Sequence, residues 1–245
     1  AVIFCNSCAR GFIFFRNGKQ LDHHYAMIGM ATVTKGYPLY YDATNEKGLS
    51  MAGLNFPNLA IYREKKDDME NIAPFELIPW ILGQCACVQE AKKLIRNLNL
   101  VNVHFSDQLP VSPLHWMIND KESSIVLESV SSGIQVYDNP FEVLTNNPPF
   151  DYHRMSMNIF MGLHAGPADN HFREAIHLTN YSLGMGALGL PGDYSSASRF
   201  VRAVCIKEKS PRDERPGRIR QFYSFQEWHD LRVMPFPVSS VHSAG

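Results

Sequence analysis

Short apolar runs separated by turn residues begin near residue 25 and predict β-strands. The runs YAMIGMATV (25–33), PLYYDA (38–43) and LSMAGL (49–54) are rich in residues that favour extended backbone. The polar stretch Asn45–Gly48 separates the second run from the third and ends in glycine, as a hairpin connection does. We therefore expect consecutive antiparallel strands over residues 25–54.

The next hydrophobic pattern has a helical period. After the polar stretch 63–71, the run FELIPWILG (75–83) predicts a helix. The run VQEAKKLIRNLNL (88–100) predicts an amphipathic helix packed on a flat surface, because four of its apolar residues share one face: Ala91, Leu94, Ile95 and Leu98.

Strands and then helices follow in the second half of the chain. Three runs joined by short polar turns predict an antiparallel meander: LHWMIND (114–120), SSIVLESV (123–130) and GIQVYD (133–138). We expect VLTNNPPF (143–150) to end a strand at a proline turn, and 151–163 and 196–206 to be helices. This order predicts an α+β fold of antiparallel sheets layered with helices, not an alternating βαβ fold.

Composition narrows the class of protein. The 245 residues form one expected domain, and the formal net charge of −1 favours neither nucleic acid nor an anionic membrane surface as a partner. No apolar stretch approaches the roughly 18 to 20 residues that a membrane-spanning helix needs. The opening run AVIFCNSC has no basic residues before it, so no secretory signal is predicted.

The cysteines indicate a reducing compartment and no metal site. Their odd number, five, argues against a disulfide framework and favours a cytoplasmic protein. Cys5 and Cys8 form a C-x-x-C pair, but no helix is expected to start there, as a redox pair would require. Cys85 and Cys87 form a C-x-C pair between two helical segments, which fits a zinc site poorly. We expect free cysteines, Cys205 included, that behave as small buried hydrophobes.

Three polar residues interrupt otherwise apolar or turn-forming stretches of the sequence. Asn55 ends an apolar run in GLNFP, Asn146 lies in VLTNNPPF, and Arg199 follows a helix start in GLPGDYSSASRF. The two asparagines fit ordinary turn residues, and the arginine fits a surface charge. Alternatively, strand ends and a helix start converge on one site, where asparagine amides donate to an oxyanion and the arginine fixes its neighbours. The pattern leaves both interpretations open. His115 fits a hydrogen-bonded core histidine better than a metal ligand.

Long ordered stretches between about residues 25 and 204 match one known pattern. They are HYAMIGMATVTKGYPLYYDATNEKGLSMAGLNFP, PFELIPWILGQCACVQEAKKLI, SPLHWMIND, VLTNNPPFDY and GMGALGLPGDYSSASRF. With few gaps they resemble the choloylglycine hydrolases, which are the bile salt hydrolases and their penicillin V acylase relatives. The resemblance implies the N-terminal-nucleophile fold, an αββα sandwich of antiparallel sheets. It also implies cleavage of the amide between a bile acid and glycine or taurine, with no cofactor and with a homotetrameric assembly.

The resemblance assigns roles residue by residue. Asn55 matches the asparagine of G-L-N-F-P, which helps to form the oxyanion hole and distinguishes bile salt hydrolases from penicillin V acylases. Asn146 in L-T-N matches the second polar position at the reaction centre, and Arg199 in A-S-R-F matches the arginine that fixes this network. The stretch HFSDQLPVSPLHW resembles the loop that covers the steroid, so apolar substrate contacts are expected from three residues: Phe105, Leu109 and Leu114.

Both ends depart from the family pattern. The family's nucleophile is a leading cysteine whose own α-amino group acts as the base, followed by an F-G-R-N-x-D motif. Here Phe15, Arg16 and Asn17 begin such a motif, but Lys19 stands where the aspartate belongs. Residues 1–24 and 224–245 are expected to diverge from the family, leaving the fold incomplete at both ends. This pattern is typical of a truncated or frame-disrupted fragment.

The sequence thus favours a bile salt hydrolase that is inactive alone because it lacks the matching cysteine. The alternatives are a non-catalytic remnant that binds amphiphiles or is unstable, and another N-acyl amide hydrolase such as a penicillin V acylase. Asn55 argues against the penicillin branch. Neither the preference for glycine or taurine nor the oligomeric state follows from the sequence.

Overall fold

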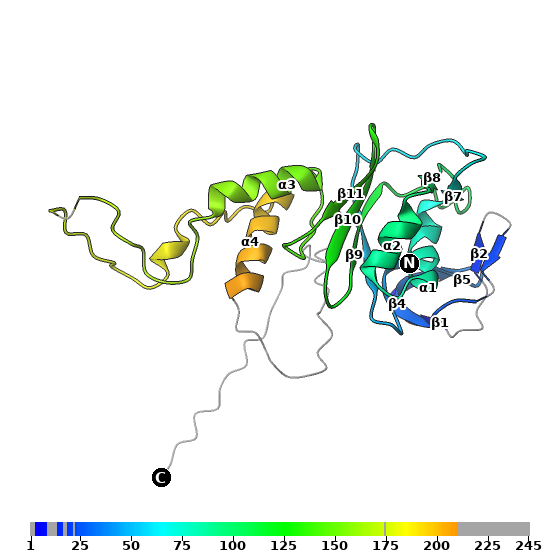
Figure 1. Cartoon of the computed structure of the whole chain (residues 1–245), viewed down its shortest axis with the longest axis horizontal. Helices are drawn as coiled ribbons and strands as arrows, with labels where there is room; N and C mark the ends of the chain where they lie inside the picture. The colour runs from blue at the N-terminus through cyan, green and yellow to red at the C-terminus, as the bar shows by residue number, and fades with distance from the viewer. Residues whose placement is uncertain (1–2, 9–13, 17–18, 22, 174, 210–245) are drawn as a thin grey trace, which may run out of the picture.

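The computed structural model describes residues 3–8, 14–16, 19–21, 23–173 and 175–209 (Figure 1). The described strands are β1 (Ile3–Cys8), β2 (Phe14–Arg16), β3 (Lys19–Leu21), β4 (Met27–Thr34), β5 (Tyr37–Asn45), β6 (Ser50–Asn55), β7 (Glu70–Ile72), β8 (Leu98–Leu100), β9 (Leu114–Asn119), β10 (Ser124–Val130) and β11 (Gly133–Asp138). The described helices are α1 (Leu77–Gln84), α2 (Val88–Ile95), α3 (Phe150–Ser156) and α4 (Ser196–Lys209), with short 3₁₀ helices at Pro74–Glu76, Met157–Phe160 and Met185–Ala187.

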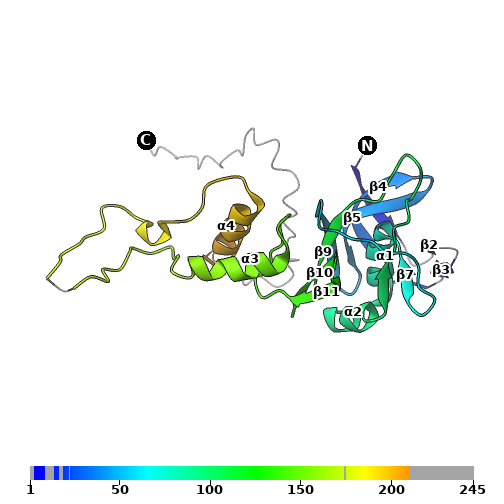
Figure 2. The same ribbon diagram turned by 90° about the horizontal axis from the view of Figure 1, so that it is seen from above.

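A seven-stranded antiparallel sheet organises the described part of the chain. Its strand order is β1-β4-β5-β6-β9-β10-β11, and every neighbouring pair is antiparallel. Helices α1 and α2 cover one face, and α3 and α4 lie on the other side (Figures 1 and 2). The expected α+β class with antiparallel strands is confirmed.

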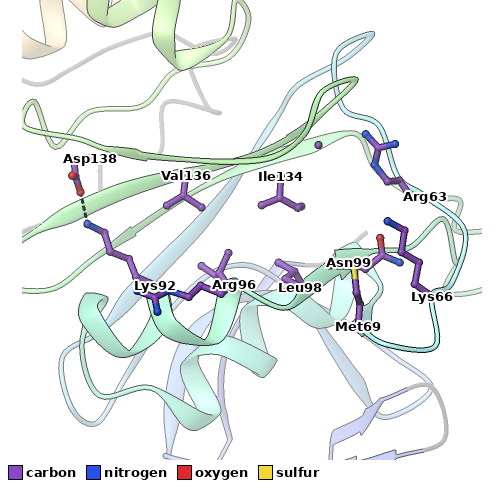
Figure 3. Close-up of a pocket in the computed structure, with 12 residues that line it drawn as sticks. Arg63, Lys66, Met69, Lys92, Arg96, Leu98, Asn99, Ile134, Val136 and Asp138 are labelled. Atoms are coloured by element: carbon purple, nitrogen blue, oxygen red, sulfur yellow. Dashed lines mark hydrogen bonds and ion pairs between the residues drawn. The ribbon is translucent and has the colours of Figure 1, made fainter.

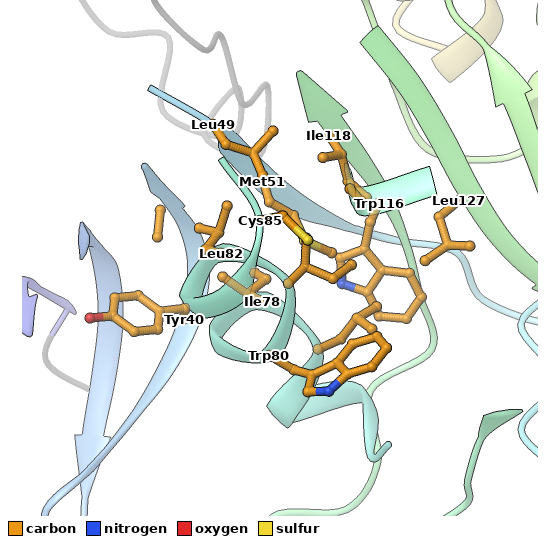
Figure 4. Close-up of a cluster of buried hydrophobic side chains, with 14 of the residues drawn as sticks. Tyr40, Leu49, Met51, Ile78, Trp80, Leu82, Cys85, Trp116, Ile118 and Leu127 are labelled. Carbon is orange, nitrogen blue, oxygen red and sulfur yellow. The ribbon is translucent and has the colours of Figure 1, made fainter. Parts of the chain in front are cut away.

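Alternating residues of the sheet supply two separate cores. On β10, Ile125 and Leu127 join the larger core beneath α1 and α2, whereas Val126 joins a smaller core with Phe150 and Phe200 of α3 and α4. The period-two alternation of a strand makes this division possible. The larger core includes Trp80 of α1 and Trp116 of β9 (Figure 4).

The turn between β5 and β6 is held by Asn45. Gly48 adopts a left-handed φ of +87°, which a residue with a side chain rarely adopts. The Oδ1 atom of Asn45 accepts the N–H groups of Lys47 (3.0 Å) and Leu49 (3.1 Å), and its Nδ2 atom donates to the carbonyls of Leu82 (2.7 Å) and Cys85 (2.8 Å). The turn is therefore attached to the C-terminal end of α1.

The expected helix over 88–100 was too long. Helix α2 ends at Ile95, and Leu98 lies in β8, which pairs in parallel with β7. The N–H of Glu70 donates to the carbonyl of Asn97 at 2.8 Å. Pairing with a distant segment thus replaces helical hydrogen bonds that the sequence pattern alone favoured. The helix at 151–163 is likewise shorter, because α3 ends at Ser156 and a 3₁₀ turn follows.

No strand forms at 143–145, which corrects the expectation for VLTNNPPF. These residues belong to a loop between β11 and α3. The Thr145 hydroxyl bonds the carbonyl of Ser196 at 3.0 Å and accepts the Ser196 hydroxyl at 2.9 Å, so this segment is attached to the start of α4.

The C-x-x-C stretch lies in the sheet. Cys5 and Cys8 are in β1, opposite Met30 and Met27 of β4. Cys85 and Cys87 lie between α1 and α2, as expected, and Cys85, Cys87 and Cys205 are free thiols. Ten residues of the expected divergent segment 1–24, and all of 224–245, lie outside the described residues.

Candidate active site

Asn55, Asn146 and Arg199 meet at one place although they are far apart in the chain. The Nδ2 atom of Asn146 donates to the backbone carbonyl of Asn55 at 2.8 Å. The Nη2 atom of Arg199 donates to Oδ1 of Asn146 at 3.0 Å. Of the two sequence-based interpretations, the geometry therefore matches convergence on one site, although of one strand end, a loop and a helix start rather than of two strand ends. The side chains of Arg199 and Asn146 and the backbone carbonyl of Asn55 form a hydrogen-bonded row, and the Asn55 side chain at its end is exposed to solvent.

Strand pairing positions Asn55. It is the last residue of β6 and pairs with Leu114 of β9, and the next backbone N–H, of Phe56, donates to the carbonyl of Pro113 at 2.8 Å. The side chain of Asn55 is exposed, and its amide has no hydrogen-bond partner among the described residues. This amide is available to a ligand.

The first turn of α4 positions Arg199. Its backbone N–H donates to the carbonyl of Ser195 at 2.9 Å, and its Nε atom donates to the carbonyl of Tyr194 at 3.3 Å. Burial and the nearby charge of Arg202 lower the pKa of the Arg199 guanidinium. An arginine fixed by two acceptors holds the Asn146 carboxamide in one orientation, with its NH₂ group toward Asn55.

His153 of α3 holds the backbone of Asn146. Its Nε2–H donates to the Asn146 carbonyl at 3.0 Å, and its ring stacks on Phe200 at 4.7 Å between ring centroids. Burial lowers the pKa of His153, and Nδ1 has no hydrogen-bond partner among the described atoms. Both observations agree with a neutral ring that carries its proton on Nε2.

A buried, hydrogen-bonded pair of side chains lies near the Asn55–Arg199 row. Glu128 of β10 and His115 of β9 are fully buried, and Glu128 Oε1 lies 2.9 Å from His115 Nδ1. The same oxygen accepts the N–H of Phe150 at 2.9 Å. The His115 ring stacks on Phe56, with ring centroids 4.3 Å apart. The pair thus connects the start of α3 with the residue that follows Asn55.

Glu128 and His153 were not predicted from the sequence. A carboxylate within the apolar run SSIVLESV was the signal for Glu128, because a charge in a buried strand needs a partner. His153 gave no signal in the sequence, since its role depends on the contact between α3 and the loop before it. His115 is a core histidine, as expected, although its Nε2 atom has no partner in the described part of the chain.

The three expected substrate contacts are distributed unevenly. Leu114 is directly opposite Asn55 in the sheet and is partly buried. Leu109 is exposed on the preceding loop. Phe105 instead contacts Tyr37 and Phe75, with ring centroids 5.7 Å and 5.2 Å away. The structure therefore brings one of the three next to Asn55.

Within the residues that the structure covers, no group of three or more His, Cys, Asp or Glu side chains is arranged to hold a metal ion. None of the helices described is both long enough and apolar enough to cross a membrane.

Comparison with known proteins identifies a family. The model of the linear amide C–N hydrolases, choloylglycine hydrolase family, matches residues 2–226. A bile salt hydrolase/transferase of Lactiplantibacillus plantarum is 54% identical over 212 residues, which cover 86% of this chain and 65% of that protein. A bile salt hydrolase/transferase of Clostridium perfringens is 39% identical over 196 residues, covering 78% of this chain and 59% of that protein.

Solved structures agree with this match. A variant of the conjugated bile acid hydrolase of Clostridium perfringens superposes with a TM-score of 0.76 at 37% identity, covering 84% of this chain and 63% of that one. Penicillin V acylase of Agrobacterium tumefaciens gives a TM-score of 0.63 at 18% identity, covering 87% of this chain and 58% of that one, which is a likeness of fold alone. The chain spans between 59% and 65% of the length of the two curated relatives described above.

Proposed function

Because this chain belongs to the choloylglycine hydrolase family of linear amide C–N hydrolases, we propose that its candidate site recognises conjugated bile salts. The observation that carries the proposal is the hydrogen-bonded row of Asn55, Asn146 and Arg199 at the end of β6. The Asn55 amide at the solvent end of this row lies beside Leu114. A polar donor next to an apolar side chain suits an amide that joins a steroid to a small polar acid.

We assign Asn55 the role of oxyanion donor. When a thiol sulfur adds to the amide carbonyl carbon, the carbonyl oxygen becomes negatively charged, and the Asn55 Nδ2–H is free to donate to it. Asn146 and Arg199 are positioning residues. Asn146 fixes the backbone of Asn55, and Arg199 fixes the orientation of the Asn146 side chain. Loss of one such donor raises a barrier by on the order of 3 kcal/mol. Leu114, Leu109 and Phe105 supply the proposed apolar contacts.

The chain by itself is proposed to bind these substrates without turning them over. The resemblance implies a nucleophilic cysteine whose own α-amino group, with an ordinary pKa of roughly 7.7 to 8.0, takes the thiol proton. None of the five cysteines stands in that pattern with an R-N-x-D motif after it. Replacing residues 1–24 with the matching segment of a relative supplies both groups.

The test compares three proteins with glycocholate and taurocholate and measures release of glycine or taurine. We expect no release by the chain itself. We expect release by a chimera in which the flanking segments of the Lactiplantibacillus plantarum relative replace 1–24 and 224–245. The same chimera with Asn55→Ala serves as the site control. Turnover by the unmodified chain that Cys5→Ala abolishes would show that the inactivity proposal is wrong. A folded chimera without any turnover would overturn the assignment of the site.

We also propose a cytoplasmic homo-oligomer, for which the family's homotetramer is the expected form. The segment between α3 and α4 extends away from the sheet (Figure 1) and exposes large apolar side chains, among them Phe172 (67%) and Leu183 (99%). Extended apolar surface of this kind favours burial against another chain. Light scattering coupled to gel filtration measures the assembly, and a monomer at all concentrations would contradict the proposal.

A further inference from the structure

A pocket lies on the side of the sheet that α1 and α2 cover (Figure 1), away from the Asn55–Arg199 row. It has a volume of about 490 Å³ and is formed by the C-terminal part of α2, strand β8, the turn after residue 62 and strand β11 (Figure 3). This volume falls within the roughly 300 to 1,000 Å³ that small-molecule sites occupy. None of its lining residues belongs to the candidate active site.

The floor of the pocket is apolar. Ile134 and Val136 of β11 point toward Leu98 of β8 across the opening (Figure 3). Leu98 is buried, Ile134 is half-buried, and Val136 is 40% exposed. Strand β11 is the last strand of the described sheet, so its apolar residues on this side have no further strand beside them. An apolar body placed here would remove this surface from water.

The rim of the pocket is strongly basic. It carries Arg63, Lys66, Lys92 and Arg96, against the single acid Asp138, although the whole chain has a net charge of −1. Lys92 is paired with Asp138. The Nη2 atom of Arg63 donates to the carbonyls of Val130 (3.1 Å) and Ser131 (2.8 Å), which fixes its guanidinium at the pocket mouth.

Two of these cations are available to a ligand. The side chains of Lys66 and Arg96 form no ion pair with any acid among the described residues. They line the same opening as Ile134 and Val136 (Figure 3). Cations beside an apolar floor favour a ligand that has both an apolar body and an acidic head group, because a neutral amphiphile gains no charge contact there and a small inorganic anion gains no apolar contact.

We propose that this pocket binds one anionic amphiphile, with its apolar body on Leu98, Ile134 and Val136 and its carboxylate or sulfonate at one of the two unpaired cations, Lys66 beside Arg63 or Arg96 beside Lys92 (Figure 3). A bile salt and a fatty acid share this chemistry. The proposal is independent of the proposed function, because it uses no residue of the Asn55–Arg199 row. It adds a second binding site for amphiphiles on the opposite side of the sheet.

Methyl resonances of Ile134 and Val136 report on this site directly. The full chain, labelled at isoleucine and valine methyl groups, is titrated with taurocholate and, separately, with laurate, both below their micelle-forming concentrations. We expect saturable shifts of both methyl groups with at least one of the two anions, and weaker binding at higher salt. Shifts with taurocholate alone would identify a steroid as the preferred apolar body of the ligand, and shifts with laurate alone would identify an alkyl chain.

Substitutions separate charge recognition from simple apolar adsorption. The double variant Lys66→Gln/Arg96→Gln should weaken binding at least about tenfold, because a hydrogen bond to a charged group contributes roughly 1.5 to 3 kcal/mol. Lys93→Gln is the matched control, because Lys93 is an exposed lysine of α2 that does not line the pocket. It should change binding less than twofold.

Three outcomes would overturn the proposal. One is the absence of shifts at Ile134 and Val136 with either anion. The second is equal shifts with the uncharged detergent octyl glucoside at the same concentration. The third is equal affinity in the double variant, provided that its spectrum shows the native dispersion. The salt dependence measured on the unmodified chain tests the proposal even if the double variant does not fold.

Discussion

The side-chain amide of Asn146 donates to the backbone carbonyl of Asn55 at 2.8 Å, between residues separated by 91 positions in the sequence. This bond fixes the end of β6 to the loop before α3. It also leaves the Asn55 side chain itself free to meet a ligand. Asn146 therefore positions the backbone of Asn55, and the Asn55 side chain is left to donate to the ligand.

Asn55→Ala should reduce kcat of the active chimera by about 10²- to 10³-fold and change KM little, because the lost donor acts on charge that develops in the transition state. Steady-state kinetics with taurocholate measures both constants. Asn102→Ala is the matched control, because Asn102 is an exposed asparagine outside the row. A rise in KM with unchanged kcat in Asn55→Ala would contradict the role of oxyanion donor.

Arg199→Ala should lower kcat of the chimera by about 10- to 100-fold, because a hydrogen bond from a charged donor contributes roughly 1.5 to 3 kcal/mol. Without this bond to Oδ1, the Asn146 carboxamide loses its fixed orientation. Arg154→Gln is the control, since Arg154 is an exposed arginine paired with nearby Asp151 and lies outside the row. If Arg199→Ala retained full activity, Arg199 would be an ordinary surface charge.

The free energy of unfolding should fall as the pH falls below about 6.5 because of His153. Burial lowers the pKa of this side chain from its ordinary value of 6.5, so the unfolded chain binds a proton more readily than the folded one. The loss is at most about 1.4 kcal/mol per pH unit for one group. Urea unfolding between pH 7.5 and 5 measures this slope.

The variant His153→Gln provides the comparison for that measurement. Its amide can still donate to the Asn146 carbonyl but does not titrate. The difference in unfolding free energy between the two proteins should therefore change with pH in the range below 6.5. A constant difference would show that His153 does not contribute to the pH dependence.

Asn45→Ala should destabilise the folded chain by about 3 kcal/mol, because buried groups that lose their hydrogen-bond partners cost roughly 1 to 3 kcal/mol each. The substitution leaves the carbonyls of Leu82 and Cys85 without the donor that Asn45 supplies. Urea denaturation measures the change, and the exposed Asn97→Ala should stay within about 0.5 kcal/mol. Equal effects of the two substitutions would show that the β5–β6 turn does not depend on its attachment to α1.

Local sequence patterns predicted most of the secondary structure. The runs that became β4, β5, β6, β9, β10 and β11 were correctly identified, because apolar runs bounded by turn residues are typical of strands. The pattern failed at Leu98, where pairing with β7 ended the helix, and at 143–145, where side-chain bonds to α4 replaced a strand. Both failures involve partners that are distant in the sequence.

The sequence by itself determined the antiparallel α+β class, the family resemblance and the identity of Asn55, Asn146 and Arg199, because these depend on local pattern and residue type. Only the tertiary structure decided that the three residues form one hydrogen-bonded row, that Glu128 and His153 support it, and that four cations surround an apolar floor beside β11. The physical reason is that hydrogen bonds and ion pairs act over a few ångströms in space. The order of residues along the chain does not specify such contacts until the sheet and its helices bring them together.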